Sequence, residues 1–158
     1  MNAGTRTEPQ APGDSDELGP IDVVVIAFPA DAPMTGEAVP ILWDLIERGI
    51  VRVLDVMFVN KDEQSRISGF EARNLKGQGL DELREFEGAS SGLLGENDIV
   101  VAGEALDPGA SAALIMYENR WAAPFVAAVR RNGGVPLAFE RVRPDDFLAA
   151  LEAAEAAA

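Results

Sequence analysis

The amino-acid sequence predicts an α/β (α+β) fold, a ferredoxin-like split β-α-β sandwich built from two pseudo-symmetric β-α-β units. Short β-branched runs alternate with helical stretches that end at glycine, which is the pattern of β-α-β units. The segment TGEAVP at 35–40 also returns as NRWAAP at 119–124, with a capping residue and a proline at the same separation. At the same offset, the apolar stripes and glycine stops of the two helices align without a gap.

The first unit comprises a strand, a helix, a second strand and a hairpin partner. IDVVVIAF at 21–28 is β-branched, short and followed by a proline, which predicts a buried strand. Residues 37–48 carry apolar side chains at helical spacing, and Gly49 can take the positive φ of a helix stop. A second strand is predicted at 51–59, with its hairpin partner in RISGFEA at 66–72.

A glycine-rich insertion at about 74–109 separates the first unit from the second. The elements predicted from there onward are, in order, short helices at 80–86 and 96–106, a strand at 111–117, a helix at 120–131 that stops at Gly133, a strand at 135–142 and a C-terminal helix that Pro144 opens.

Two origins of the repeat remain open: a true duplication, and two β-α-β units that happen to use the same start and stop residues. In the split arrangement each unit leaves a gap that a strand of the other fills. The helix starts at Thr35 and Asn119 then lie at opposite ends of the sheet and cannot easily form one anion pocket. A doubly wound sheet is the second choice, and it would place both helix starts at one edge.

Length and composition restrict the class of protein. The first 19 of 158 residues are polar, acidic and rich in proline and glycine, so we expect a disordered tail followed by a single domain at 20–158. The formal charge of −14 disfavours nucleic acid as a partner. No apolar run is long enough to insert into a membrane, and the absence of cysteine fits a reducing cytoplasm.

Cysteine and histidine are both absent, which removes the thiolate nucleophile, the commonest general base and the usual metal ligands. No recognisable catalytic motif, metal site or cofactor site remains, so we expect a protein that is not an enzyme.

Several strands are apolar at successive positions, so both faces of the sheet need cover. The two unit helices cover one face, and the insertion with the terminal helix, or a second subunit, covers the other. We therefore expect a homo-oligomer.

The most distinctive chemical cluster is YENRW, which comprises Tyr117, Glu118, Asn119, Arg120 and Trp121 at a strand-to-helix junction. Loops at strand ends are where ligands bind in α/β folds, so the cluster is a candidate site for a ligand or a protein partner. The structural interpretation is that the asparagine caps the helix, the glutamate pairs with or orients the arginine, and the tryptophan packs at the helix start.

Three further polar residues are candidates for a role beyond surface solvation. Thr35 and Glu37 are ligand or partner candidates at the first helix start, where capping and the helix dipole also explain them. Asp55 lies inside an apolar strand, and a buried carboxylate needs a partner. Because Arg52 lies three residues earlier, we expect an ion pair at an edge or interface rather than a catalytic acid.

Four segments carry a resemblance to a known family. IAFP with TGEA, DLIERGIVRVLDVMFVNKD, LDPGASAALIMYENRWA and RRNGGVPLAFERV resemble a family of small actinobacterial proteins of unknown function. That family is similar to glycine-rich bacterial membrane proteins, also of unknown function, which carry an apolar segment in the middle. In this chain the middle is short and acidic, so membrane insertion does not carry over. The resemblance implies no catalytic residues.

The leading hypothesis is a cytoplasmic, non-enzymatic module that self-associates and serves in assembly or regulatory binding. A small-molecule sensor or enzyme that uses the Glu118 and Trp121 edge, with Glu118 as its acid or base, is the first alternative. An accessory partner of the membrane-bound relatives is the second.

Overall fold

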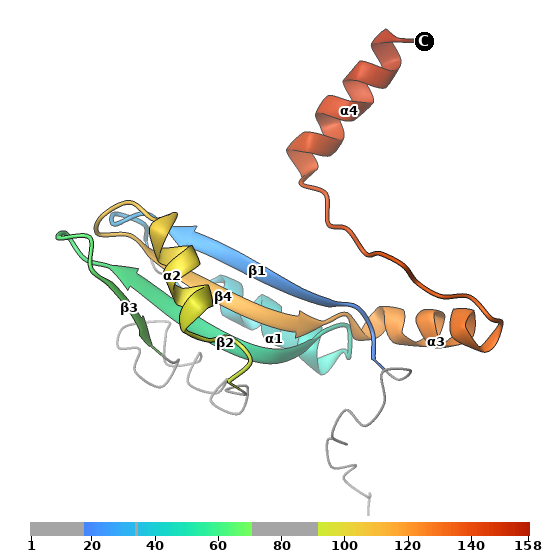
Figure 1. Ribbon diagram of the computed structural model, residues 1–158, viewed down its shortest axis with the longest axis horizontal. Coiled ribbons are helices and arrows are strands. Elements are labelled where there is room, and N and C mark those ends of the chain that lie inside the picture. Colours follow the sequence, from blue (N-terminus) through green and yellow to red (C-terminus); the bar gives the residue numbers. More distant parts are fainter. Residues whose placement is uncertain (1–17, 34, 71–91) are drawn as a thin grey trace, which may run out of the picture.

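The computed structural model describes residues 18–33, 35–70 and 92–158 (Figure 1). Within these ranges the chain forms a four-stranded antiparallel sheet in the order β1-β4-β2-β3. The elements are β1 (Ile21–Phe28), α1 (Ala38–Glu47), β2 (Arg52–Lys61), β3 (Ile67–Phe70), α2 (Glu96–Glu104), β4 (Ser111–Glu118), the short 3-10 helix η4 (Arg120–Ala122), α3 (Ala123–Arg131) and α4 (Pro144–Ala156). The fold is therefore mixed α/β, as the alternation of strand and helix patterns predicted.

The strand β4 lies inside the sheet and pairs with β1 on one side and with β2 on the other. Every residue of β1 has a partner on β4, from Ile21 opposite Glu118 to Phe28 opposite Ser111. Within the described residues β1 has no neighbour on its other side, which we call the open edge of β1. The strand predicted at 21–28 is confirmed, but the prediction that it is buried is wrong, because most of its side chains are exposed.

One face of the sheet is covered by α1, which lies behind the sheet in Figure 1. Val39, in the first turn of α1, is buried against Val56 and Phe58 of β2 and Ala113 of β4. The helix ends before Gly49, whose φ of +69° is the left-handed conformation that glycine adopts without strain. The predicted helix and its glycine stop are both confirmed.

The opposite face is covered by α2, which begins at residue 96 as predicted for the second helix of the insertion and ends at Glu104, before the predicted end at residue 106. Its cluster of buried side chains comprises Val59, Leu94, Ala102, Leu106, Ala110, Ala112 and Leu114. Two glycines allow close packing, because a Cβ atom at Gly103 or Gly69 would collide with Ile67 or Ile99 respectively. The insertion therefore covers β2, β3 and β4 on this face, as expected. The expected contribution of the terminal helix is wrong, because no residue of α4 is buried. The expectation that both unit helices cover the α1 face is also wrong, because the main contact of α3 among the described elements is with η4.

The second β-α-β unit is incomplete in this chain. Residues 135–142 form no strand, and their apolar side chains are exposed. The preceding helix α3 packs on neither face of the sheet; its main contact within the described elements is with η4, and it extends past the end of the sheet (Figure 1). The ferredoxin-like order and the pseudo-symmetry are therefore not confirmed. The doubly wound alternative is wrong, since all pairings in the sheet are antiparallel.

Both copies of the repeated pattern, a capping residue followed by a proline, lead into a helix. Pro40 and Pro124 lie in the first turns of α1 and α3, where the missing N–H costs no helical hydrogen bond. The chain before each helix is irregular, and before α3 it forms η4. Of the disordered tail expected at 1–19, residues 1–17 lie outside the described residues, as does the helix expected at 80–86. The expectation is wrong for Gly19, which is buried and donates its N–H to Glu118.

Candidate functional site at the β1–β4 junction

The YENRW cluster lies where β4 ends beside the start of β1. Because β1 and β4 are antiparallel, Tyr117 and Glu118 lie opposite Asp22 and Ile21. Thr35 follows the other end of β1, so it lies at the opposite end of the sheet, as expected from the split arrangement. The structure therefore brings the five YENRW residues together and keeps Thr35 and Glu37 apart from them.

Glu118 is only 1% exposed, and its carboxylate is already engaged by other residues of the chain. Oε2 accepts a 2.8 Å hydrogen bond from the Gly19 N–H, and Oε1 lies 2.9 Å from Nε of Arg52. The atoms of the second contact are not aligned as in a hydrogen bond, so it is an ion pair. Arg120, the partner expected from the sequence, is more distant, with Nη1 at 3.9 Å from Oε1. The carboxylate thus joins the ends of β4 and β2 to the residues before β1.

Asn119 connects the same residues from the other side. Its Nδ2 donates to the Pro20 carbonyl at 3.0 Å and to Asp22 Oδ2 at 2.7 Å, and its backbone N–H also donates to Pro20. Its Oδ1 accepts a 3.3 Å hydrogen bond from Trp121 Nε1. The capping role expected for this side chain is wrong, since it makes no cap hydrogen bond to η4. The Trp121 ring is 66% exposed rather than packed at the helix start.

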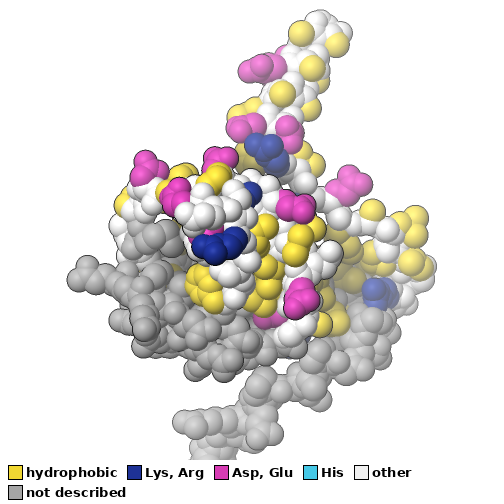
Figure 2. All heavy atoms as spheres, turned by 60° about the vertical axis from the view of Figure 1, so that its left-hand side comes forward, with side chains coloured by type: hydrophobic (Ala, Val, Ile, Leu, Met, Phe, Trp, Pro, Cys, Tyr) yellow, Lys and Arg dark blue, Asp and Glu magenta, His cyan; other side chains and the backbone are white. Residues whose placement is uncertain are grey.

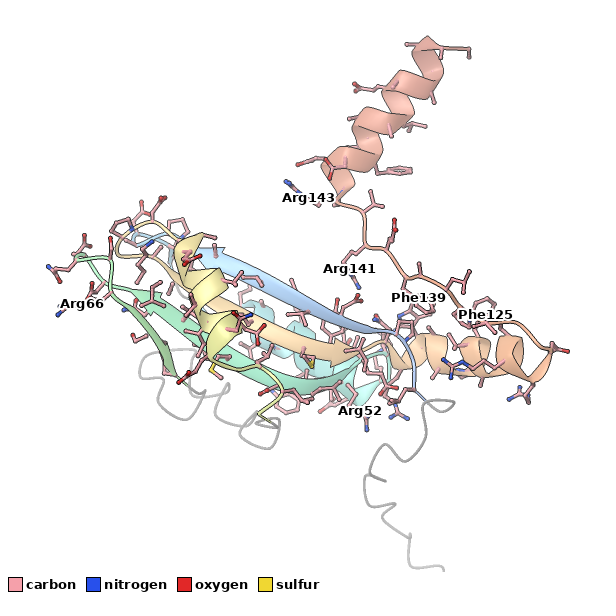
Figure 3. All side chains as sticks on the ribbon, in the orientation of Figure 1. Arg52, Arg66, Phe125, Phe139, Arg141 and Arg143 are labelled. Atoms are coloured by element: carbon pink, nitrogen blue, oxygen red, sulfur yellow. The ribbon has the colours of Figure 1, made fainter. Side chains whose placement is uncertain are left out.

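A further ion pair at this junction joins Asp22 of β1 to Arg141, which lies in the segment after α3. Figure 3 shows Arg141 pointing toward the sheet, and its guanidinium lies 5.8 Å from the centroid of the Tyr117 ring. Sequence reasoning missed both residues, because their contact depends on where the chain returns after α3. We call this set of three residues the Arg141 clamp.

The Arg141 guanidinium holds the pKa of Asp22 below its usual value, and the Asn119 amide acts in the same direction. When folding lowers the pKa of a carboxyl group, the charged group stabilises the folded state at every pH above its pKa in the unfolded state. This contribution is lost as the pH falls through the lowered pKa of the folded state. Arg141→Gln is therefore expected to raise the pKa of Asp22 toward its usual value in an NMR titration of the carboxyl carbon. The control Arg143→Gln, at an exposed neighbouring arginine, leaves that pKa unchanged, and an unchanged pKa in Arg141→Gln would contradict the clamp.

At the other end of β1, the polar side chains shape the start of α1. The Glu37 N–H donates a 3.4 Å hydrogen bond to Thr35 Oγ1, and Glu37 is the residue directly before the helix. Gly36, between them, has a φ of +73°. These contacts explain both residues as parts of the turn into α1.

Asp55 has partners other than the one expected from the sequence. Its Oδ1 accepts the Val56 N–H at 2.9 Å, and its Oδ2 accepts the Leu94 N–H at 2.8 Å. A β-bulge between Val53 and Asp55 turns the carboxylate to the α2 face, whereas simple alternation would have put both residues on one face. The expected ion pair with Arg52 is wrong, because that arginine pairs with Glu118. Asp55 instead holds the chain that leads into α2 against β2.

The two buried carboxylates differ in how far their oxygens are engaged. Both oxygens of Asp55 accept a backbone N–H, whereas Glu118, within the residues that the structure describes, accepts one at Oε2 and none at Oε1, which lies beside Arg52. Among the described ranges, no group of three acidic side chains is arranged to hold a metal ion. No helix in the described part of the chain is long and apolar enough to cross a membrane.

The fold and the junction define a mixed α/β domain whose buried polar groups bind one another and whose sheet has an open edge. Residues 17–157 match a family of unknown function, DUF6325, and the chain belongs to this family. The resemblance to a family of unknown function is thereby confirmed, while the similarity to membrane proteins stays a prediction. No curated protein and no solved structure matches the chain.

Proposed function

We propose that this chain is a non-enzymatic module that self-associates and serves in assembly or regulatory binding. The observation that carries the proposal is the open edge of β1. On the α2 side of this strand, Ile21, Val23 and Val25 form an apolar row that is exposed in the single chain. Edge strands with exposed apolar side chains are templates for pairing with another chain.

A second group of exposed apolar side chains follows β4 and supports the same proposal. Large apolar side chains are exposed from α3 to the end of the chain, namely Phe125, Val135, Leu137, Phe139, Val142, Phe147, Leu148 and Leu151. Figure 2 shows α4 standing out from the rest of the molecule, with hydrophobic and acidic side chains on its surface. A monomer would keep these side chains in water, whereas an assembly can bury them.

A small-molecule sensor or enzyme at the Glu118 and Trp121 edge is the alternative function. The exposed Trp121 ring would give a ligand a surface on which to stack. The contacts of Glu118 with Gly19 and Arg52 support a structural role for its carboxylate over an acid or base role. A saturable change in tryptophan fluorescence with a metabolite, lost in Trp121→Phe, would favour this alternative.

The test of self-association uses two copies of the full chain with different fluorescent tags. We expect energy transfer between them at micromolar concentration, and Val25→Lys in both copies should weaken the association about tenfold because it places a charge in the apolar row. The matched control is Val101→Lys, at an exposed valine of α2 away from β1, and it should leave the transfer unchanged. Absence of transfer with the unaltered chain would overturn the proposal.

A further inference from the structure

Residues 135–142, which we call the arm, have the composition of a strand and no strand partner in the chain. Val135, Leu137 and Phe139 alternate with other residues, as in a strand with one apolar face. Leu137 is 93% exposed, and the Arg141 clamp is the contact that holds the end of the arm at β1. Figure 3 shows Phe139 and Arg141 on this extended stretch, outside the sheet.

If Arg141 keeps its pairing with Asp22 when an arm lies on the open edge of β1, that pair sets the register between the two strands. With Arg141 opposite Asp22, an antiparallel arm places Phe139 opposite Val24 and Leu137 opposite Ile26. The arm and β1 then match along their whole length, from Val142 opposite Ile21 to Val135 opposite Phe28. A parallel arm in the same register would run past the start of β1 and pair with little of it.

In this register the apolar side chains of the arm share one face of the sheet. Directly opposed residues share a face of the sheet, so Phe139, Leu137 and Val135 would lie on the face that α1 covers. Phe28 already packs against the α1 cluster on that face. A proline at position 136 is acceptable because the arm would be an edge strand.

The added strand would give the order arm-β1-β4-β2, in which strands of the two β-α-β units alternate. That is the split arrangement which the repeated sequence pattern predicted. The chain thus contains all the strands of the split fold, but its own arm is not placed on the edge.

We propose that the open edge of β1 binds the arm of a second copy of this chain, and that the two copies exchange arms reciprocally. The proposal rests on the proposed self-association and names its partner and its contact. Exchange of an identical element between protomers is a common route to dimers, because the exchanged contacts are those of the closed fold.

Two observations favour a second copy over closure within one chain. The helix α3 carries the arm past the end of the sheet (Figure 1), its main contact among the described elements is with η4, and Phe125 on α3 is 69% exposed, so the arm begins away from the open edge of its own β1. Residues 119–143 carry five arginines against a single glutamate, in a chain whose net charge is −14. The remainder of each copy is therefore strongly acidic, so the basic region of one copy is attracted to the other copy, and the attraction is reciprocal.

The test uses engineered cysteines, which are the only thiols because the chain has none. Ile26→Cys is placed in one tagged full-length copy and Leu137→Cys in an untagged copy, and the mixture is oxidised. We expect a disulfide between the two copies. A second matched pair, Val24→Cys with Phe139→Cys, should give the same product. In the control, Ala138→Cys replaces Leu137→Cys, and because residue 138 would face the other side, the product should fall to background.

The outcomes separate this proposal from the proposed function. One outcome is energy transfer between tagged copies, while neither cysteine pair gives more disulfide than the Ala138→Cys control. That outcome would overturn arm exchange and leave self-association standing. A disulfide that forms within single chains carrying both Ile26→Cys and Leu137→Cys, and not between copies, would overturn exchange in favour of closure. Absence of energy transfer would overturn both proposals.

Discussion

Replacement of Glu118 by alanine is expected to lower the free energy of unfolding by about 3 kcal/mol, which is the lower end of the range found when one partner of a buried ion pair is removed. The change leaves the Gly19 N–H without its acceptor and Arg52 without its counter-charge. Urea unfolding followed by circular dichroism measures the effect through the shift of the midpoint.

Two control variants separate the contacts of this carboxylate. Glu118→Gln keeps the size of the side chain and one acceptor oxygen, so its cost is expected to be about half that of alanine. Arg120→Ala removes the more distant and largely exposed arginine, and it should change the free energy of unfolding by less than about 1 kcal/mol. An alanine variant at position 118 as stable as the unaltered chain would show that the junction does not hold β1 in place.

Replacement of Asp55 by alanine is expected to lower the free energy of unfolding by about 2 to 4 kcal/mol, because it leaves two N–H groups without their acceptor. The carboxylate is 1% exposed and accepts the N–H groups of Val56 and Leu94. The loss of the Leu94 contact should also loosen the start of α2. Hydrogen exchange of the α2 amides should therefore be faster in this variant than in the unaltered chain.

The isosteric variant Asp55→Asn tests whether the stability of the fold depends on the hydrogen-bond acceptors of Asp55 more than on the volume of its side chain. Its amide keeps one oxygen, so we expect a loss of stability between those of the unaltered chain and the alanine variant. Asp44→Ala serves as the surface control, because its i,i+4 pair with Arg48 is exposed on both sides. Equal losses for Asp55→Ala and Asp44→Ala would contradict the assigned role of Asp55.

Local sequence patterns predicted most of the elements, because each depends on residues close together in the chain. The β-branched run at 21–28 forms β1, and the acidic start after Pro144 opens α4. Gly49 and Gly133 both take positive φ after their helices, as the stop signals required. These features follow from backbone preference and the spacing of apolar side chains.

Contacts between distant residues could not be predicted in the same way. The bulge between Val53 and Asp55 turns Asp55 to the α2 face, and nothing in the local alternation marks it. Arg52 consequently pairs with Glu118, which lies beside it across the β2–β4 register, and not with its neighbour in sequence. Register and bulges depend on the assembled sheet, so spacing along the chain assigned the wrong partner.

At the candidate site, too, residues close together in the sequence were predicted, whereas contacts between distant residues were not. Sequence reasoning singled out the YENRW cluster, and the structure places all five residues at one junction. It did not identify Asp22 or Arg141, whose ion pair joins segments from opposite ends of the chain. The strand predicted at 135–142 does not form in the single chain although the edge of β1 is open, because α3 carries this segment past the end of the sheet.

The most direct test of self-association is sedimentation velocity of the full chain from low to high micromolar concentration. We predict a species with twice the mass of the chain, which dissociates on dilution and is lost in Val25→Lys at concentrations where Val101→Lys retains it. A single species with the mass of one chain at every concentration would contradict self-association.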